Sequence, residues 1–512
     1  MSLIGKQFFQ LGLLSLASYP LGFLLQLLMS YYFGTSVQVD AYWVVLTLIN
    51  FFGFFVHPVR EAIVSGYHLR RAQGKEQADR YFSSAVNLLV LLLLASSALL
   101  YGSPRLFASL LVGAEKSVLL EEVIRLLYYA APLVTLLFVS EIFSGFLVST
   151  GRIFFQDFGR IVGSSLAVVC LWTLAGRVGV LSMIAAALVS NLLLVAVQLL
   201  ALRNSPFSYR FFSRPRIDTG SLRMSGALVT AYFVSQLYLV YERTVFVGLS
   251  EGALAAFQYA LALSNVCHAV CIGNICNVLW PRIVELLVAR DEEGVRKLLA
   301  ISMKNVVLLL VFLALFLGCY ADSVTYLLFF RGRFDARSLA LTAGFFRAVL
   351  ISLPFLAVSG IMGRLLATRQ FTSYIFAVGV CSATGGVLTL ALAQLTGSLG
   401  AAGYHTAVSA SCGAAVSGYA AYRLYLRHLA PGARRAAFFW LGKGILLAAG
   451  TLALFLSAPL GSAGGKLFML SHLLLRFSVG GLLFFGLAYR FGLLHLADGF
   501  REFAARKLGR CA

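Results

Sequence analysis

The chain has 512 residues, of which 60% are hydrophobic and only 12% are charged. Soluble globular domains carry about 25% charged residues, so this composition excludes that class. The formal net charge is +21. Because the basic residues gather in short loops between apolar runs, the charge follows the positive-inside pattern of membrane proteins and does not indicate a nucleic-acid partner.

Apolar runs of roughly 20 residues, the length that a helix needs to cross a bilayer, recur from one end of the chain to the other. They predict an all-α polytopic membrane protein with about fourteen transmembrane helices. We expect the first helix to be retained, because no small-residue cleavage pattern follows it. The predicted spans are 10–33, 41–66, 82–101, 123–149, 157–175, 179–202, 222–248, 254–280, 301–329, 338–367, 371–395, 399–425, 436–457 and 467–489.

Lys and Arg are concentrated in alternate loops. Basic clusters follow the second, sixth, eighth and twelfth predicted spans and fill the C-terminal tail. Since basic loops stay in the cytoplasm, both termini are predicted to be cytoplasmic. One loop breaks the rule, because Arg331 and Arg333 follow the ninth span and lie on the predicted outer side.

Two segments resemble each other and indicate an internal repeat. Residues 33–36 and 247–250 each precede a polar-studded helix, a proline and a basic loop. The two copies are six predicted spans apart and therefore run parallel, which predicts two six-helix lobes followed by two further helices. The predicted domains are an N-terminal lobe at 1–203, a cytoplasmic linker at 204–222, a C-terminal lobe at 223–428, and the last two helices with a basic tail at 429–512.

Catalytic signatures are absent from the sequence. No phosphate-binding glycine loop is followed by Lys-Ser or Lys-Thr, and the seven histidines show no metal-ligand spacing. The eight cysteines lie mostly inside apolar spans without metal-type pairing. We therefore expect a transporter or flippase and not an enzyme, with no metal or cofactor, driven by a Na⁺ or H⁺ gradient, the membrane potential or the substrate's own gradient.

Charged and amide side chains inside the spans are the candidate functional residues, because such groups at membrane depth mark a transport pathway by default. The alternative is that they form structural ion pairs and hydrogen bonds between helices. Arginine is the best candidate for a phosphate-binding group, since its charge is permanent and its fork matches phosphate geometry. The substrate-binding candidates are Arg243, Arg60, Arg347, Glu242, Asn265 and His268; the ion-coupling or gating candidates are Asp40, Glu61 and Glu141; the outer-loop candidates are Arg331 and Arg333.

Two of these pairs are adjacent in sequence: Arg60 with Glu61, and Glu242 with Arg243. Adjacent residues point about 100° apart on a helix. We therefore expect each of these charges to pair with a group on another helix. We also expect that Arg243→Ala abolishes transport without preventing folding.

Five segments carry a resemblance to a known family. They are FGTSVQVDAY at 33–42, GFLVSTGRIFFQDFGRIVGS at 145–164, ERTVFVGLSEGALAAFQYALAL at 242–263, WPRIVE at 280–285 and YLLFFRGRFDARSLALTAGFF at 326–346. In order and spacing they resemble the MviN/MurJ lipid II flippases of the MOP exporter superfamily. The last segment resembles the family's motif after the ninth helix and accounts for the basic outer loop.

The resemblance implies two lobes around a central cavity that alternates its opening while a lipid-linked sugar head group passes through. It implies that cavity arginines hold the pyrophosphate and that Na⁺ or the membrane potential drives the cycle. It further implies a monomer in a bacterial cytoplasmic membrane, in contact with lipids and with enzymes of cell-wall or polysaccharide synthesis. Asp40 matches the family's acidic residue, and Glu242 with Arg243 matches its acidic-arginine pair.

The chain also departs from the family pattern. Arginines of the second helix are replaced by Gly53 and Phe54, an acidic-arginine pair in the eighth helix is replaced by Leu261 and Ala262, and the first helix lacks arginine. These departures indicate a divergent member that handles lipid II or a related cell-wall or exopolysaccharide precursor. Two alternatives stay open: an ion-coupled drug or metabolite antiporter of the related MATE type, and a non-transporting scaffold for polysaccharide assembly.

Overall fold

A computed structural model gives the fold of the chain. It divides into two compact units. The first contains residues 1–259, 331–338 and 393–399, and the second contains the rest of the chain. The structure describes residues 20–54, 56, 60, 67, 70–71, 73–113, 115–150, 152–203, 209, 219–269, 271, 283–369, 371–426, 431–457 and 465–494.

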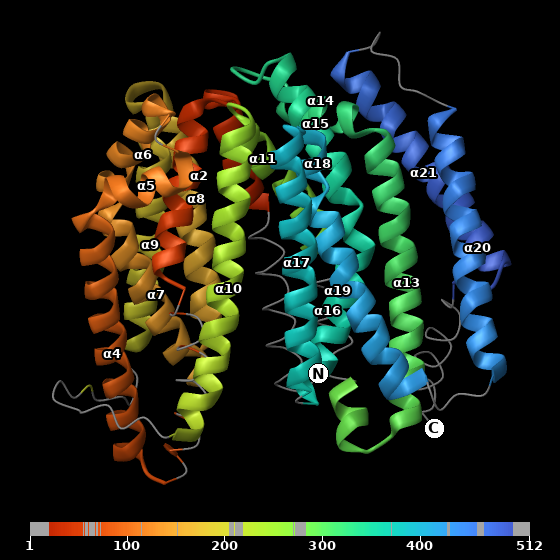
Figure 1. Cartoon of the computed structure of the whole chain (residues 1–512), viewed down its shortest axis with the longest axis horizontal. Coiled ribbons are helices and arrows are strands. Elements are labelled where there is room, and N and C mark those ends of the chain that lie inside the picture. Colours follow the sequence, from red (N-terminus) through yellow and green to blue (C-terminus); the bar gives the residue numbers. More distant parts are fainter. Residues whose placement is uncertain are drawn as a thin grey trace. The chain divides into compact units, whose positions relative to one another are not determined.

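In the described residues of the first unit, the regular secondary structure is all helical. In it α8 and α9 pack along each other, α7 packs against α9, and α2 packs against α6 and α10 (Figure 1). Its helices are Pro20–Phe33, α2 (Val37–Phe52), α4 (Lys75–Gly102), α5 (Pro104–Val112), α6 (Ser117–Tyr129), α7 (Ala131–Ser149), α8 (Ile153–Val178), α9 (Leu181–Leu202), α10 (Thr219–Leu249) and the first part of α11 (Ala253–His268).

The second unit is likewise helical where it is described. In it α16 packs against α13 and α19, and α20 packs against α13 and α21 (Figure 1). An aromatic cluster that includes Phe312, Phe316, Tyr320 and Phe455 joins α13, α20 and α21. The elements are α13 (Glu292–Cys319), α14 (Ala321–Phe329), α15 (Ala336–Leu350), α16 (Ser352–Thr368), α17 (Thr372–Thr396), α18 (Leu399–Gly403), α19 (His405–Ala421), the π-helix η2 (Tyr422–Leu426), α20 (Pro431–Leu456) and α21 (Lys466–Arg490).

The helices carry the surface of a membrane protein. Large apolar side chains such as Leu91, Trp172 and Leu395 are exposed, which is expected where lipid and not water is the solvent. Within the described residues, eight helices are long and apolar enough to cross a membrane, and nine if α15 and α16 form one span bent by 43°. The prediction of an all-α polytopic membrane protein is therefore confirmed at this level.

Two predicted spans are broken where the sequence predicted continuous helices. The span at 123–149 breaks at Ala130, between α6 and α7, and the span at 338–367 breaks at Ile351, between α15 and α16. In each case a proline follows the break, Pro132 in the first and Pro354 in the second. Proline has no N–H and its ring collides with the carbonyl four residues earlier, so a new helix starts there instead.

The close pairing of α8 and α9 depends on small residues. A Cβ added at Gly163 on α8 would collide with the carbonyl oxygen of Ser190 on α9. Small side chains let two membrane helices approach until their backbones touch, which is the main source of packing energy in lipid. Gly163 belongs to the segment at 145–164 that carries part of the family resemblance, and its role in the fold is this contact.

Candidate functional site

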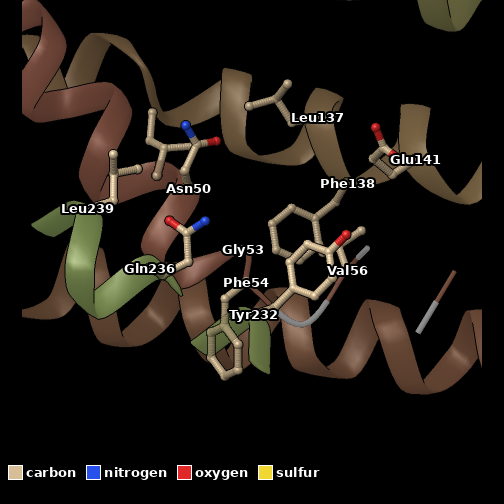
Figure 2. A pocket seen from close by; sticks show the side chains of 11 residues that line it. Asn50, Gly53, Phe54, Val56, Leu137, Phe138, Glu141, Tyr232, Gln236 and Leu239 are labelled. Carbon is tan, nitrogen blue, oxygen red and sulfur yellow. The ribbon is translucent and has the colours of Figure 1, made fainter. Parts of the chain in front are cut away.

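A pocket of about 300 Å³ lies within the first unit, among α2, α7 and α10. Its polar lining comes from Asn50, Glu141, Tyr232 and Gln236, and Figure 2 shows the amides of Asn50 and Gln236 at one end with Glu141 toward the other. The apolar lining comprises Ile49, Gly53, Phe54, Val56, Leu137, Phe138 and Leu239. Polar groups of this kind, gathered in a cavity of a membrane protein, make it the candidate site.

Glu141 at this pocket is paired with Arg60. The guanidinium Nη1 lies 2.7 Å from Oε2 of Glu141, and each side chain is about a quarter exposed. A Cβ at Gly145, one turn further along α7, would come within 2.8 Å of Cγ of Arg60. The bare glycine therefore leaves room for the arginine stem to lie across α7 and reach Glu141. Glu61, the predicted neighbour in this group, lies outside the described residues.

Exchanging the two charges tests this ion pair. Glu141→Arg alone places two cations together and is expected to lower the melting temperature, and adding Arg60→Glu is expected to restore most of the loss. The coupling is expected to be about 1 kcal/mol, since the pair is only partly buried. Melting of the purified protein, followed by tryptophan fluorescence, measures it.

The exposed pair Glu76 and Arg80 provides the matched control for that exchange, because its side chains are 59% and 61% exposed. Reversing both of those charges is expected to leave the melting temperature unchanged. If the double exchange at Arg60 and Glu141 melts no higher than Glu141→Arg alone, the two side chains do not interact.

Arg243 and Glu242 on α10 form a buried ion pair. Nη1 of Arg243 lies 2.8 Å from Oε1 of Glu242, and both side chains are less than a tenth exposed. With the amide oxygen of Gln258 turned toward the guanidinium, that oxygen accepts hydrogen bonds from both Nη atoms of Arg243, the one from Nη2 at 3.0 Å. Arg243 therefore links α10 to α11.

The expectation that each charge pairs with a group on another helix is met for Arg243 by Gln258, but Glu242 and Arg243 also pair with each other, which the sequence did not predict. Their Cβ atoms do point in different directions, but the arginine stem is long enough to turn the guanidinium back to the preceding carboxylate. Burial makes an unpaired charge so costly that this return is favoured. A phosphate that bound Arg243 in this conformation would compete with Glu242.

Asp40 on α2 is buried and holds the start of α11. Its Oδ2 accepts a hydrogen bond from the N–H of Gly252 at 2.7 Å, and its Oδ1 accepts one from the N–H of Ala255 at 2.8 Å. The first N–H groups of a helix have no partner within the helix, and a carboxylate is a favoured acceptor for them. Asp40 thus caps α11 from another part of the chain. Its predicted role in ion coupling or gating stays a prediction.

Three segments meet around this cap, and we call them the glycine junction: residues 31–36, 250–259 and 331–338. Gly34, Gly252 and Gly332 have φ of +58°, +76° and +61°, which favours glycine at all three. An added Cβ at Gly34 would lie 2.5 Å from the carbonyl oxygen of Arg333. Added Cβ atoms at Gly252 and Gly332 would collide with carbonyl oxygens of the segment at 31–36.

Hydrogen bonds join the three segments of the glycine junction. The N–H of Arg333 donates to the carbonyl of Tyr31 at 2.9 Å, and the hydroxyl of Tyr259 donates to the carbonyl of Gly34 at 2.9 Å. The hydroxyls of Thr35 and Ser338 lie 2.7 Å apart. Three of the segments that resemble the known family therefore converge at one place in the first unit.

The basic outer loop has a backbone role in this junction. Asp335 caps α15, because its Oδ1 accepts from the N–H of Ser338 at 2.8 Å. Donation from the Ser338 N–H and hydroxyl holds the pKa of Asp335 below its usual range. The cap therefore stabilises the fold at pH values above the ordinary pKa of an aspartate. This stability is lost only as the pH falls through the lowered pKa of Asp335. The side chains of Arg331 and Arg333 are exposed, and their predicted role toward a head group stays a prediction.

The remaining candidates lie in the second unit. Arg347 on α15 forms an ion pair with Asp322 on α14, and both side chains are roughly half exposed. Asn265 is exposed and His268 is half-buried at the end of α11. The structure thus gives Arg347 a partner that sequence reasoning did not name. Their roles in substrate binding stay predictions.

Comparison with known proteins decides the family. A protein-family model described as lipid II flippase MurJ matches residues 29–484, which is most of the chain. The chain belongs to the MurJ lipid II flippase family. The prediction of the family is thereby confirmed, together with the prediction of a transporter that flips a lipid-linked precursor and is not an enzyme.

Solved structures support the same fold. A lipid II flippase MurJ in an inward closed conformation is 17% identical, with a TM-score of 0.77, over 92% of this chain and 98% of that one. A MATE multidrug transporter in an inward-facing conformation is 15% identical, with a TM-score of 0.65, over 80% and 96%.

A MOP superfamily transporter from Pyrococcus furiosus, described as having a binding pocket of reverse polarity, is 14% identical, with a TM-score of 0.59, over 82% of this chain and 96% of that one. The search of curated protein sequences found no match. At these identities the solved structures show the shared fold and nothing further about this chain.

Sequence reasoning missed three polar residues of the pocket, which are Asn50, Tyr232 and Gln236. Asn50 and Gln236 could have been found from the sequence, because an amide side chain inside an apolar helix is the same feature that made Asn265 a candidate. The MurJ-family positions Gly53 and Phe54, noted in the sequence for their lack of charge, also lie in this lining.

Proposed function

We propose that the chain flips a polyprenyl-pyrophosphate-linked glycan across the membrane by alternating access, with lipid II or a related cell-wall or exopolysaccharide precursor as the substrate. The observation that carries the proposal is the match of the MurJ family model to residues 29–484. The fold similarity to a MurJ structure over nearly the whole of both chains supports it.

The second candidate is an ion-coupled antiporter of the MATE type, which shares the fold. Such a transporter needs a carboxylate that exchanges protons or cations. Two of the three carboxylates proposed from the sequence have other partners here, since Asp40 accepts from two backbone N–H groups and Glu141 pairs with Arg60. The third, Glu61, lies outside the described residues. The partner of Glu141 is an arginine, a residue type suited to phosphate, and this favours the flippase. A non-transporting scaffold is the third candidate.

The arrangement in the membrane belongs to the same proposal. The protein has about fourteen spans, with both termini on the cytoplasmic side of a bacterial cytoplasmic membrane. The lobes are 1–203 and 223–428, joined by the linker at 204–222 and followed by the helices and tail at 429–512. The cycle is coupled to Na⁺ or H⁺, the protein acts as a monomer, and enzymes of cell-wall or polysaccharide synthesis are its partners.

Among the basic residues, Arg243, Arg60 and Arg347 are proposed to contact the pyrophosphate during the cycle. Arg331 and Arg333 are proposed to steer the head group at the outer side. Arginine suits this role because its fork binds phosphate oxygens in pairs and its charge does not titrate. Arg243 and Arg60 would have to exchange a carboxylate partner for the substrate, which makes their ion pairs part of the cycle.

Replacement of a host flippase tests which glycan is carried. A bacterium is depleted of its own lipid II flippase, this chain is expressed, and growth and the exposure of lipid II on the outer face are measured. Restored growth with exposed lipid II identifies lipid II as the substrate. No restoration, with the protein verified in the membrane, excludes lipid II and leaves another lipid-linked glycan to be tested directly.

A further inference from the structure

We propose that the pocket among α2, α7 and α10 binds an uncharged sugar ring of the head group and not its pyrophosphate. The inference rests on the proposed function, because it assigns one part of that substrate to one site. In this assignment the pocket of the first unit binds the sugar, and other residues bind the phosphate.

The charge of the pocket favours a neutral ligand. Among its described lining residues there is one carboxylate, Glu141, and no Lys, Arg or His. The charge of Glu141 is already offset by Arg60 at 2.7 Å. A pyrophosphate within this lining would be desolvated beside Glu141 with no cation among the described lining residues, which is unfavourable in a low-dielectric site. Arg60 is not one of those residues, so its proposed contact with the pyrophosphate lies outside the pocket. A sugar brings no charge and meets no such penalty.

The hydrogen-bonding groups of the pocket suit hydroxyls. Oε1 of Gln236 is buried and has no hydrogen-bond partner among the described residues. Asn50 is exposed within the lining, and its amide lies near that of Gln236 (Figure 2). An amide offers both a donor and an acceptor, and a sugar hydroxyl can be either. Two hydroxyls of one ring can therefore engage both amides and satisfy the oxygen of Gln236.

The size and the rings of the pocket fit the same ligand. A volume of about 300 Å³ is at the small end for ligand pockets, which range over roughly 300–1,000 Å³. It therefore suits part of a glycan and not a complete head group. Phe54, Phe138 and Tyr232 supply aromatic surface in the lining, against which the apolar C–H face of a sugar ring can pack.

Two soluble probes test the assignment with the purified full-length protein in detergent. One is a short-chain prenyl pyrophosphate that carries a neutral disaccharide, and the other is the same prenyl pyrophosphate without sugar. Calorimetry gives the affinity for each, and their ratio isolates the contribution of the sugar. The variants are Asn50→Ala and Gln236→Leu; Asn50 is exposed, so its replacement does not threaten folding.

The wild-type protein is expected to prefer the glycosylated probe. Each variant is expected to lose roughly tenfold of that preference, the equivalent of one or two hydrogen bonds, while its affinity for the bare probe is unchanged. A purely structural role of Gln236 would instead change the melting temperature and leave the preference intact.

Gln26 provides the matched control. Its Oε1 is also buried without a partner in the described part of the chain, but it lines a second pocket of the first unit, of about 280 Å³. Gln26→Leu is expected to keep the preference for the glycosylated probe.

Three outcomes would overturn the assignment: variants that keep the full preference, variants that weaken both probes equally, or a wild-type protein without a preference. If the wild-type protein binds neither probe, the proposed function fails as well. If it flips the glycolipid but the variants keep their preference, only the sugar site is wrong.

Discussion

Asp40→Ala is expected to destabilise the protein by about 3 kcal/mol, because it removes the acceptor for two buried backbone N–H groups at the start of α11, and hydrogen bonds to a charged group contribute most. The two bonds are 2.7 and 2.8 Å long, and the side chain of Asp40 is 2% exposed. Because the side chain is buried, its removal leaves both N–H groups without their acceptor. Melting of the purified variant in detergent measures the effect.

Asp335→Ala is the matched control for Asp40. It is also a capping aspartate, but it is exposed and accepts one backbone N–H, that of Ser338. Removing an exposed cap typically costs about 1 kcal/mol. Asp40→Ala should therefore melt well below Asp335→Ala. Equal melting temperatures would mean that the buried cap contributes no more than an exposed one, which would contradict the role assigned to Asp40.

Arg243→Ala is expected to destabilise the protein by roughly 3–5 kcal/mol, since it leaves the carboxylate of Glu242 buried without its arginine partner. The sequence alone predicted loss of transport without loss of folding. The structure changes that expectation, because Arg243 is less than a tenth exposed and also binds Gln258. Melting in detergent and the yield of folded protein check the new prediction.

A double variant separates stability from transport at this pair. Replacing Glu242 by Gln together with Arg243 by Met removes both charges and keeps the volume, so most of the stability should return. If Arg243 also binds the pyrophosphate, this folded variant should still fail to flip substrate. Normal flipping by the double variant would show that Arg243 only holds α10 to α11.

The family and the helical character of the chain were predictable, because the length and hydropathy of each apolar run and the order of the motifs can be taken directly from the sequence. The helix breaks after Ala130 and before Ser352 were predictable in principle, since Pro132 and Pro354 mark them. They were missed because hydropathy continues unchanged across each proline.

The contacts of the site were not predictable in the same way. Asp40 meets Gly252 across 212 positions of sequence, and no periodic pattern links residues so far apart. The motifs at 33–42, 242–263 and 326–346 were visible in the sequence, but only the fold shows that their glycines pack against one another's segments. The pocket was missed for a similar reason, because Asn50 and Gln236 come from different helices and become a site only where α2 and α10 meet.

Transbilayer movement of the substrate in vesicles tests the central claim most directly. The purified chain is reconstituted in liposomes with a fluorescent polyprenyl-pyrophosphate disaccharide, and the fraction that reaches the outer leaflet is measured with a quencher that does not cross the membrane. Faster exposure than in protein-free vesicles, with no antiport of a fluorescent organic cation against Na⁺ or H⁺, is the predicted result. Cation antiport without movement of the glycolipid, by protein shown to be folded, would contradict the account.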